Sequence, residues 1–402
     1  MLSIRKFTWK SCETFTDLAN KFFFYVIQKA SAQKTQRIDF IFDSYFEQSV
    51  KSTEHLRRSK TECIILHSID DHTKLPKQEN KFWGSSRNKI LLQQFLKRHI
   101  EKQTVLNNYD IVFSTINEDP STSNIINLID SQLQRSDVEE ADVKIIIHIN
   151  HAVLNGFENI YLISSDTDVM VLALFFFESF KNLGLKTLWI QGGSGKCTRN
   201  IAIHSLARLH GKQVCSILPA LHHLTGGDYT SKVGTKARAL KENPTQYLQN
   251  FARDCSPFSI EKCTKNAEKF LVNITKTVDC NCTSFDELRV WIYKHKNSVI
   301  ENLPPTSNSI KLHILRAFYV VHIQTNVLNS AMDELDPTSY GFFMDDNLLM
   351  PQKVHILIPL AEKLPAGCNC SVCGPRCNCR RLKILCCTFC ACMKKNTCTN
   401  KQ

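Results

Sequence analysis

Acidic residues stand at four places along this chain where a predicted strand ends, a predicted helix begins or a turn is expected. In a sheet flanked by helices, the carboxyl ends of the strands and the starts of the helices meet along one edge. We therefore expect side chains that are far apart in the sequence to gather at that edge. The six residues are Asp43, Glu140, Asp142, Asp166, Asp168 and Asp228.

Six carboxylates on one edge repel one another unless cations neutralise them. Carboxylate oxygens are the ligands that Mg²⁺ and Mn²⁺ prefer, and two such ions about 4 Å apart can activate a water and stabilise a leaving oxygen. The four clusters together predict a two-metal site for Mg²⁺ or Mn²⁺. Taken singly, each cluster also has a simpler interpretation, since acids favour helix N-termini and Asp is common in turns and caps.

Strands and helices alternate along the first half of the chain. This alternation predicts an α/β fold with a mostly parallel sheet and helices on both faces. Apolar residues at helical spacing predict helices over 14–30, 88–103, 137–156 and 198–211, and short apolar runs predict strands over 37–42, 110–115, 159–165 and 186–190.

We expect three regions: an α/β domain over residues 1–245, a mainly helical extension over 246–350, and a linker with a cysteine-rich module over 351–402. The composition, 43% hydrophobic and 22% charged, is typical of a globular protein. The longest apolar run, 169–177, is shorter than the roughly 20 residues that a membrane span needs. The first residues lack the apolar core of a secretory signal, so we expect an intracellular protein without a membrane partner.

The positive charge is concentrated at the C-terminal end. Residues 363–402 hold eight of the Lys and Arg residues and no acid, so they account for +8 of the net +12 and leave +4 for the rest. A basic segment favours a polyanionic partner such as nucleic acid.

Ten of the 18 cysteines lie in the same segment. Repeated C-x-C and C-x-x-C spacings let one turn of backbone present two thiolates to one zinc ion, and ten thiolates suffice for a cluster with bridging sulfurs. A metallothionein-like store or a purely structural zinc knot remain alternatives. The predicted Zn²⁺ ligands are Cys368, Cys370, Cys373, Cys377, Cys379, Cys386, Cys387, Cys390, Cys392 and Cys398.

The acidic segments resemble the PIN-like domain of the flap-endonuclease branch. "FDSYFEQSVKSTEHLRR" resembles that family's strand-end Asp followed by cations, "VEEADV" its helix-opening acids, "SSDTDVMVL" its D-x-D and "TGGDYTS" its Gly-x-Asp turn. The sequence around these motifs is similar to that of a poorly characterised group of animal PIN-like proteins that look transposon-derived. The cysteine segment resembles tesmin-like CXC domains, which bind zinc and, in some members, DNA.

The resemblance implies a nuclear, metal-dependent nuclease that hydrolyses phosphodiester bonds of DNA or RNA, with the six acids as catalytic metal ligands. It also implies that Lys51, Arg57 and Arg58 orient the substrate phosphate. Members of the family carry a further Asp on a strand before the first helix. That strand is not visible here, and Asp17 falls inside the predicted helix. The alternative hypothesis is therefore a catalytically inactive PIN-like protein that binds DNA or protein through its zinc segment.

Two further patterns point to no site. "QGGSGKCT" lacks the first Gly and the final Ser or Thr of a nucleotide-binding P-loop, so we interpret its glycines as a turn before the next helix. The pairs His148 with His151 and His222 with His223 have no evident third metal ligand, and we expect core or surface histidines.

Overall fold

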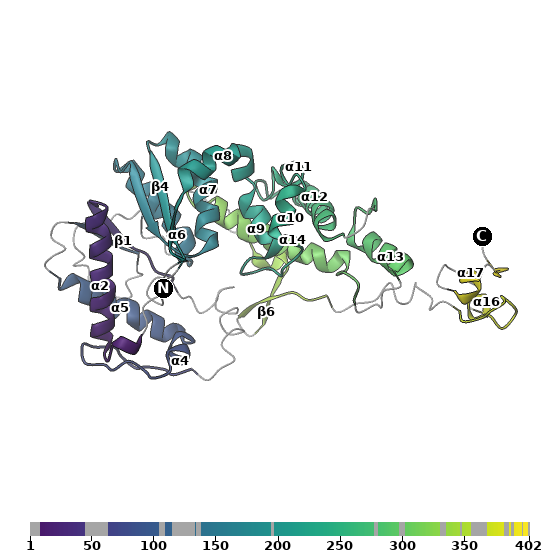
Figure 1. Cartoon of the computed structure of the whole chain (residues 1–402), viewed down its shortest axis with the longest axis horizontal. Helices are drawn as coiled ribbons and strands as arrows, with labels where there is room; N and C mark the ends of the chain where they lie inside the picture. Colours follow the sequence, from purple (N-terminus) through teal and green to yellow (C-terminus); the bar gives the residue numbers. More distant parts are fainter. Residues whose placement is uncertain are drawn as a thin grey trace. The chain divides into compact units, whose positions relative to one another are not determined.

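The computed structural model is a mixed α/β structure with small sheets (Figure 1). It divides into two compact units, one of residues Met1–His223 with Tyr319–Met350, the other of Leu224–Phe318 with Pro351–Gln402. The residues that the structure describes are 9–44, 63–103, 109–114, 133, 138–193, 197–276, 280–296, 302–329, 335–345, 348–354, 368–381, 386, 390–395 and 397–400.

The first unit begins with elements that enclose one apolar core. Phe15, Phe82 and Leu92 are fully buried in this core. The predicted helices over 14–30 and 88–103 are confirmed as α2 and α5, and both begin at side-chain caps. The elements are η1 (Trp9–Ser11), α2 (Phe15–Ala32), β1 (Arg37–Phe40), α4 (Glu79–Trp83), α5 (Ser86–Glu101) and β2 (Asp110–Phe113).

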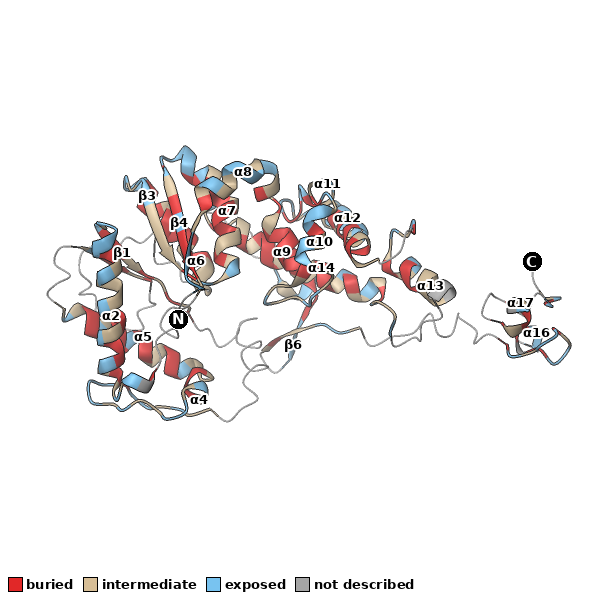
Figure 2. Ribbon diagram, in the orientation of Figure 1, coloured by how far each residue is buried: buried red, intermediate tan, exposed pale blue. Residues whose placement is uncertain are grey.

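A second apolar core of the same unit lies around Val169, Leu172 and Leu188. Figure 2 shows buried residues on the helices and the strand that carry it. The helix predicted over 137–156 is observed as α6, and Gly156 ends it with a backbone φ of +86° that only glycine adopts without strain. The elements are α6 (Ala141–Leu154), β3 (Asn159–Ile163), α7 (Thr167–Asn182), β4 (Thr187–Gly192), β5 (Arg199–Ala202) and α8 (Ile203–Cys215).

The sheets are smaller and less parallel than predicted. β1 pairs with β2 in parallel, β3 pairs with β4 in parallel, and β4 pairs with β5 in antiparallel fashion. Within the described residues the strands form sheets of two or three, so a large parallel sheet is not seen there.

One predicted helix is partly wrong. Residues 199–202 form strand β5 instead of the first turn of the helix predicted over 198–211. Gly193, with φ of +82°, allows a turn after β4, and Ile190 then pairs with Ile201. The glycines therefore precede a strand, because a short apolar run adopts whichever conformation its neighbours pair with.

The second unit is mainly helical over its first stretch. α12 starts at Ser256, whose side chain caps the helix, with Pro257 at its first position. Two strands near the end of the predicted helical extension were not expected. The elements of the second unit are α10 (Lys236–Lys241), α11 (Thr245–Leu248), α12 (Pro257–Thr275), α13 (Phe285–Lys296), α16 (Asn378–Arg381) and α17 (Ala391–Lys394). The ranges of α9 (Leu218–Gly226) and α14 (Ser307–Thr325) include residues of both units. η7 (Pro337–Tyr340), β6 (Phe342–Asp345) and β7 (Leu348–Pro351), apart from Pro351, fall within the ranges of the first unit.

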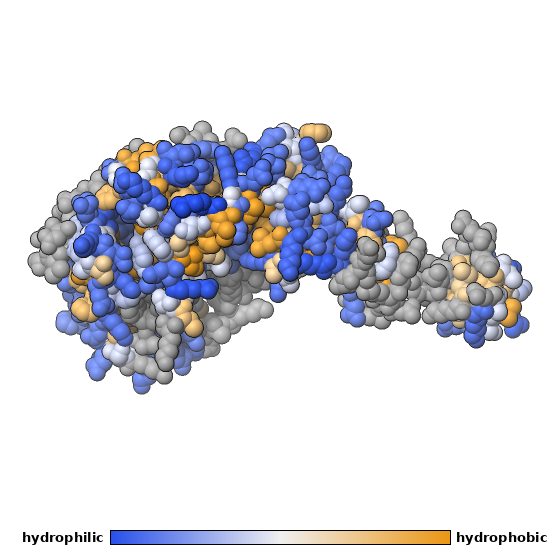
Figure 3. Space-filling view, turned by 45° about the horizontal axis from the view of Figure 1, so that its top comes forward, coloured by the Kyte–Doolittle hydropathy of each residue, from blue (hydrophilic) through white to orange (hydrophobic). Residues whose placement is uncertain are grey.

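Hydrophilic residues predominate on the face shown in Figure 3, where apolar residues also gather. Phe24 and Phe258 are among the large apolar residues that are exposed in the described part of the chain. None of the described helices combines the length and the apolar composition that crossing a bilayer requires.

Candidate metal centres

Three of the predicted carboxylates converge in the first unit. Asp142 lies in the first turn of α6, Asp166 is the N-cap of α7, and Asp168 lies in the first turn of α7. One oxygen of each lies within 4.8 Å of an oxygen of the other two. All three side chains are half-buried, so the group is open enough to admit an ion and sheltered enough for charges to interact strongly.

Local hydrogen bonds explain why α7 begins where it does. The Asp166 Oδ1 accepts the backbone N–H of Asp168 at 3.1 Å, and the Asp166 N–H donates to Ser164 Oγ at 3.1 Å. The N-termini of α6 and α7 carry partial positive charge, which favours carboxylates there. The same local preference that starts the helices thus assembles the acids.

Asp43 and Glu140 belong to the same acidic neighbourhood. The Asp43 Oδ1 accepts the backbone N–H of Ala141 at 3.0 Å, and Glu140 is the N-cap of α6. Burial, and then the charges of Asp166, Glu140, Asp168 and Asp43, raise the pKa of Asp142 well above its usual value. Four of the other predicted carboxylates therefore act electrostatically on Asp142.

A buried lysine that the sequence reading did not single out supports the segment bearing Asp43. The Lys144 ammonium, on α6, donates to the Phe42 carbonyl at 3.4 Å and to Ser44 Oγ. The Ser44 N–H donates to the Glu139 carbonyl at 2.8 Å. Lys144 thus fixes the backbone on both sides of Asp43, and no sequence signal marks a lysine within an otherwise apolar helix for this role.

Asp228 belongs to the second unit. It is exposed in the turn after α9, where the Gly227 N–H donates to Thr230 Oγ1 at 2.9 Å. A recess of about 410 Å³ next to this turn is lined by Lys232 and Lys236 together with glycines and threonines. That Asp228 joins the carboxylates of the first unit remains a prediction.

Four predicted site residues lie outside the described residues: Lys51, Arg57 and Arg58, assigned to the substrate phosphate, and Cys387, assigned to zinc. Their roles stay predictions.

The other predicted cysteines form a compact cluster. The described residues contain several groups of thiols whose sulfurs all lie within 4.8 Å of one another, and Cys386 belongs to three of them. Shared thiols are what bridging between neighbouring zinc ions requires. The groups are Cys368–Cys386–Cys390–Cys392, Cys368–Cys377–Cys379–Cys386, Cys373–Cys386–Cys392–Cys398 and Cys370–Cys373–Cys377.

Backbone hydrogen bonds between distant parts of the segment hold this cluster together. The Ala391 N–H donates to the Cys368 carbonyl at 2.8 Å, and the Cys386 N–H donates to the Asn400 carbonyl at 2.8 Å. The backbone N–H of Arg380 lowers the pKa of Cys377 to about 6, whereas burial raises the pKa of Cys386 to about 12. The thiols would bind zinc as thiolates, and the lowered pKa of Cys377 favours its thiolate.

The histidines of α6, for which the sequence left a core or a surface position open, are buried. His148 Nδ1 donates to Asp39 Oδ2 at 2.7 Å, and Arg37 binds Asp39 through two nitrogens at 2.7 and 2.8 Å. Arg37 also donates to His151 Nδ1 at 2.9 Å. Burial alone would raise the pKa of Asp39, but the hydrogen bonds from His148 and Arg37 bring it below the usual value. This network ties β1 to α6.

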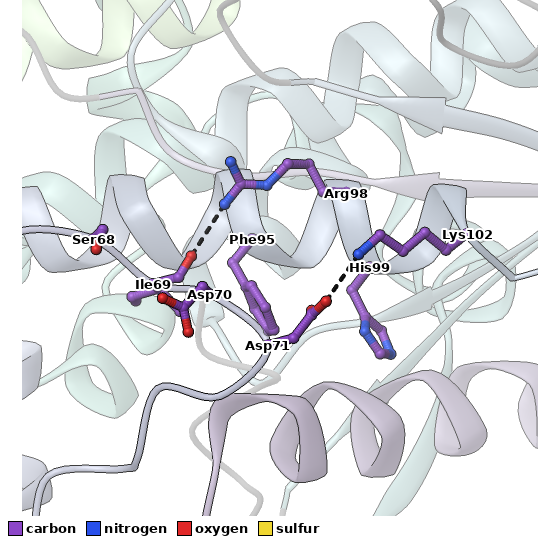
Figure 4. Close-up of a pocket in the computed structure, with 8 residues that line it drawn as sticks. All are labelled: Ser68, Ile69, Asp70, Asp71, Phe95, Arg98, His99 and Lys102. Atoms are coloured by element: carbon purple, nitrogen blue, oxygen red, sulfur yellow. Dashed lines mark hydrogen bonds and ion pairs between the residues drawn. The ribbon is translucent and has the colours of Figure 1, made fainter.

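In a separate recess of about 330 Å³ in the first unit, the cationic side chains already bind protein groups (Figure 4). Arg98 donates to the Ile69 carbonyl at 3.1 Å, and Lys102 pairs with Asp71 at 3.0 Å. Phe95 and His99 stack beside them. Since each charged group already has a protein partner, we assign no site there.

No family model matches the chain, and no curated protein and no solved structure matches it either. Function must therefore be inferred from the geometry of the two clusters.

Proposed function

We propose that this chain is a metal-dependent nuclease of the PIN-like type that hydrolyses phosphodiester bonds of DNA or RNA in the nucleus. The single observation that carries the proposal is the convergence of Asp142, Asp166 and Asp168 with the charges of Asp43 and Glu140 around them. Strand ends and helix starts supply these acids in the order that the family's motifs lead us to expect.

The donor set fits a hard divalent cation. The close group in the first unit contains carboxylates alone, which suits Mg²⁺ or Mn²⁺ better than a metal that prefers sulfur or imidazole. Asp142, Asp166 and Asp168 would hold the ion, with Asp43, Glu140 and Asp228 completing a two-metal site. When bound, such ions polarise the phosphate and lower the pKa of a water.

The protein's own groups have distinct tasks in this proposal. The helix N-termini, and the hydrogen bond from the Ala141 N–H to Asp43, hold the carboxylates in place before substrate arrives. The carboxylates then need not reorganise during the reaction. Lys51, Arg57 and Arg58 would orient the scissile phosphate. Lys232 and Lys236, with the glycine-rich backbone around them, would contact a phosphate chain.

The C-terminal cysteine cluster would serve as a zinc-binding, CXC-type segment that contacts nucleic acid. Its support is the set of shared thiols, together with the exposed cations Arg376, Arg380 and Arg381 beside them. Phosphate contacts from such cations give affinity without sequence preference. This binding role would persist if the acidic site were inactive, and it is the second candidate function.

The test is cleavage of single-stranded, duplex and 5′-flap DNA and of RNA with Mn²⁺ by the full chain. Asp166→Asn combined with Asp168→Asn should lower the rate by orders of magnitude, and so should Asp228→Ala. Asp71→Asn, which removes an exposed carboxylate paired with Lys102, is the matched control and should leave the rate unchanged. Equal cleavage by all variants would identify a contaminant. No cleavage by the wild type, with nucleic acid still bound, would favour the second candidate.

A further inference from the structure

His222, on α9, contacts one of the three converging carboxylates. Its Nε2 lies 2.8 Å from Asp168 Oδ1, and the side chains of His222 and Asp168 are 7% and 16% exposed. An ionised carboxylate only accepts hydrogen bonds, so the imidazole supplies the N–H. A buried, charge-assisted bond of this length is among the stronger polar contacts that a protein makes.

The neighbouring histidine shows that this contact is specific to one position. His223 is equally buried, and its ring meets that of His222 edge to face with centroids 5.3 Å apart. The Nε2 of His223, however, bonds to Gln324 Oε1 at 2.9 Å. Two adjacent histidines on one helix thus bond to different partners, His222 to Asp168 and His223 to Gln324.

His222 lies beside the group of close ligand atoms and is not a member of it, for in the part of the chain that the structure describes that group consists of Asp142, Asp166 and Asp168. The terminal torsion of an Asp side chain is broad, so a free carboxylate samples many orientations. A hydrogen bond to one carboxylate oxygen fixes that torsion. The direction of the other oxygen is then fixed as well, because the two oxygens belong to the same planar group. A ligand held this way binds metal with less loss of side-chain freedom.

We propose that His222 is a positioning residue that orients the Asp168 carboxylate for a divalent metal ion and so sets the affinity of the site. The inference rests on the divalent-metal part of the proposed function and adds a residue outside the acidic motifs. It assigns a task to a histidine that the sequence alone places in the core or on the surface. It also separates the two members of the pair, with His223 serving packing and internal hydrogen bonding.

The experiment measures Mn²⁺ affinity by calorimetry on the zinc-loaded full chain, with thermal melting of every variant. The Asp166→Asn, Asp168→Asn double variant defines binding at this site. His222→Leu removes the donor and should weaken binding about tenfold or more, the range for outer-shell partners of metal ligands. His222→Gln keeps an N–H donor and should recover most of that affinity. His223→Leu should lower the melting temperature and leave the affinity unchanged.

The outcomes separate the inference from the proposed function. If the wild type binds no Mn²⁺ that the double variant loses, the metal site itself is refuted and the inference falls with it. If the wild type binds and His222→Leu binds equally well, only the inference is refuted. Equal weakening by His222→Leu and His223→Leu would show a merely structural role. Should His222→Leu fail to fold, His222→Asn, too short to reach Asp168, replaces it against His222→Gln with the same expected difference.

Discussion

The two candidate metal centres are built in opposite ways. The carboxylates of the first unit stand at the edge of apolar cores and are placed by backbone N–H groups, a lysine and the starts of two helices. The cysteine cluster has no comparable core, because its buried described residues are the cysteines themselves. The acidic site lies at the edge of a fold that hydrophobic burial stabilises. In the cysteine module, the candidate metal ligands themselves form the buried interior. The first unit should therefore fold without metal and bind it afterwards, whereas the cysteine module should fold only when metal is bound.

Removing zinc should have the largest effect. Chelation should unfold residues 368–400 and leave the α/β unit folded, because metal binding supplies roughly 10–16 kcal/mol in small zinc modules. Backbone amide NMR of the full chain, before and after chelator, would follow both regions at once. Loss of signals from α5 and α7 together with the module would contradict the comparison, as would elemental analysis with less than one zinc per chain.

Breaking the buried network of the first unit should come next. Asp39→Asn removes the partner of Arg37 and His148 and leaves a buried guanidinium without its counter-charge, which typically costs about 3–5 kcal/mol. Urea unfolding followed by tryptophan fluorescence would measure this, and the loss should be the same with and without zinc. The control, Asp71→Asn, breaks an exposed ion pair and should change stability little. A zinc-dependent loss would mean that the two regions are not independent.

The pH dependence of the metal-free protein should reveal the strain at the acidic edge. Burial and then the neighbouring acids raise the pKa of Asp142, so the folded state holds a proton that the unfolded state releases. Stability attributable to Asp142 is then full at low pH and is lost as pH rises from the ordinary Asp value of 3.8 through the raised one.

Asp142→Asn should remove that slope and stabilise the metal-free fold at neutral pH, while Mn²⁺ should stabilise the wild type more than the variant. Urea titrations over a pH series with EDTA or Mn²⁺ would show this. Parallel slopes for the two proteins would argue that Asp142 is solvated like a surface acid.

The smallest expected effect is the loss of a single helix cap, which serves as a reference for an ordinary local contact. Ser85 caps α5 by accepting the Asn88 N–H at 3.3 Å. Ser85→Ala should cost about 1 kcal/mol, as for other N-caps. Differential scanning calorimetry with and without each metal should give the same small shift. A shift that depends on metal would place α5 within one of the two centres.

Local patterns predicted the elements whose signals are local. The apolar spacing and caps of α2 and α5 and the strand-end position of the D-x-D are readable from short windows. Asp142 was predicted in the first turn of a helix, and Asp166 and Asp168 after a strand; α7, which Asp166 caps, was not predicted. β5 was missed because its conformation depends on pairing with β4.

Partners distant in sequence could not be predicted. The reach of Lys144 to Phe42 and Ser44, and of His222 to Asp168, joins residues that only the packed fold brings together. The strand predicted over 37–42 ends earlier, at Phe40, so that Asp43 lies in the loop after the strand instead of at its end. There the chain leaves its pairing with β2, and contacts with α6 determine its path instead.

The contacts between β1 and α6 have a mechanical consequence. They occur at two places: Arg37 and Asp39 on β1 with His148 and His151, and Phe42 to Ser44, just after β1, with Lys144 and the start of the helix. His148 is six residues beyond Asp142, roughly 9 Å along the helix axis at 1.5 Å per residue. A strand and a helix fastened at two such separated points move as one stiff body. Weakening the contacts of His148 and His151 would therefore tilt the start of the helix, where Asp142 lies. The spacing of the converging carboxylates is thus set partly by residues that do not contact them.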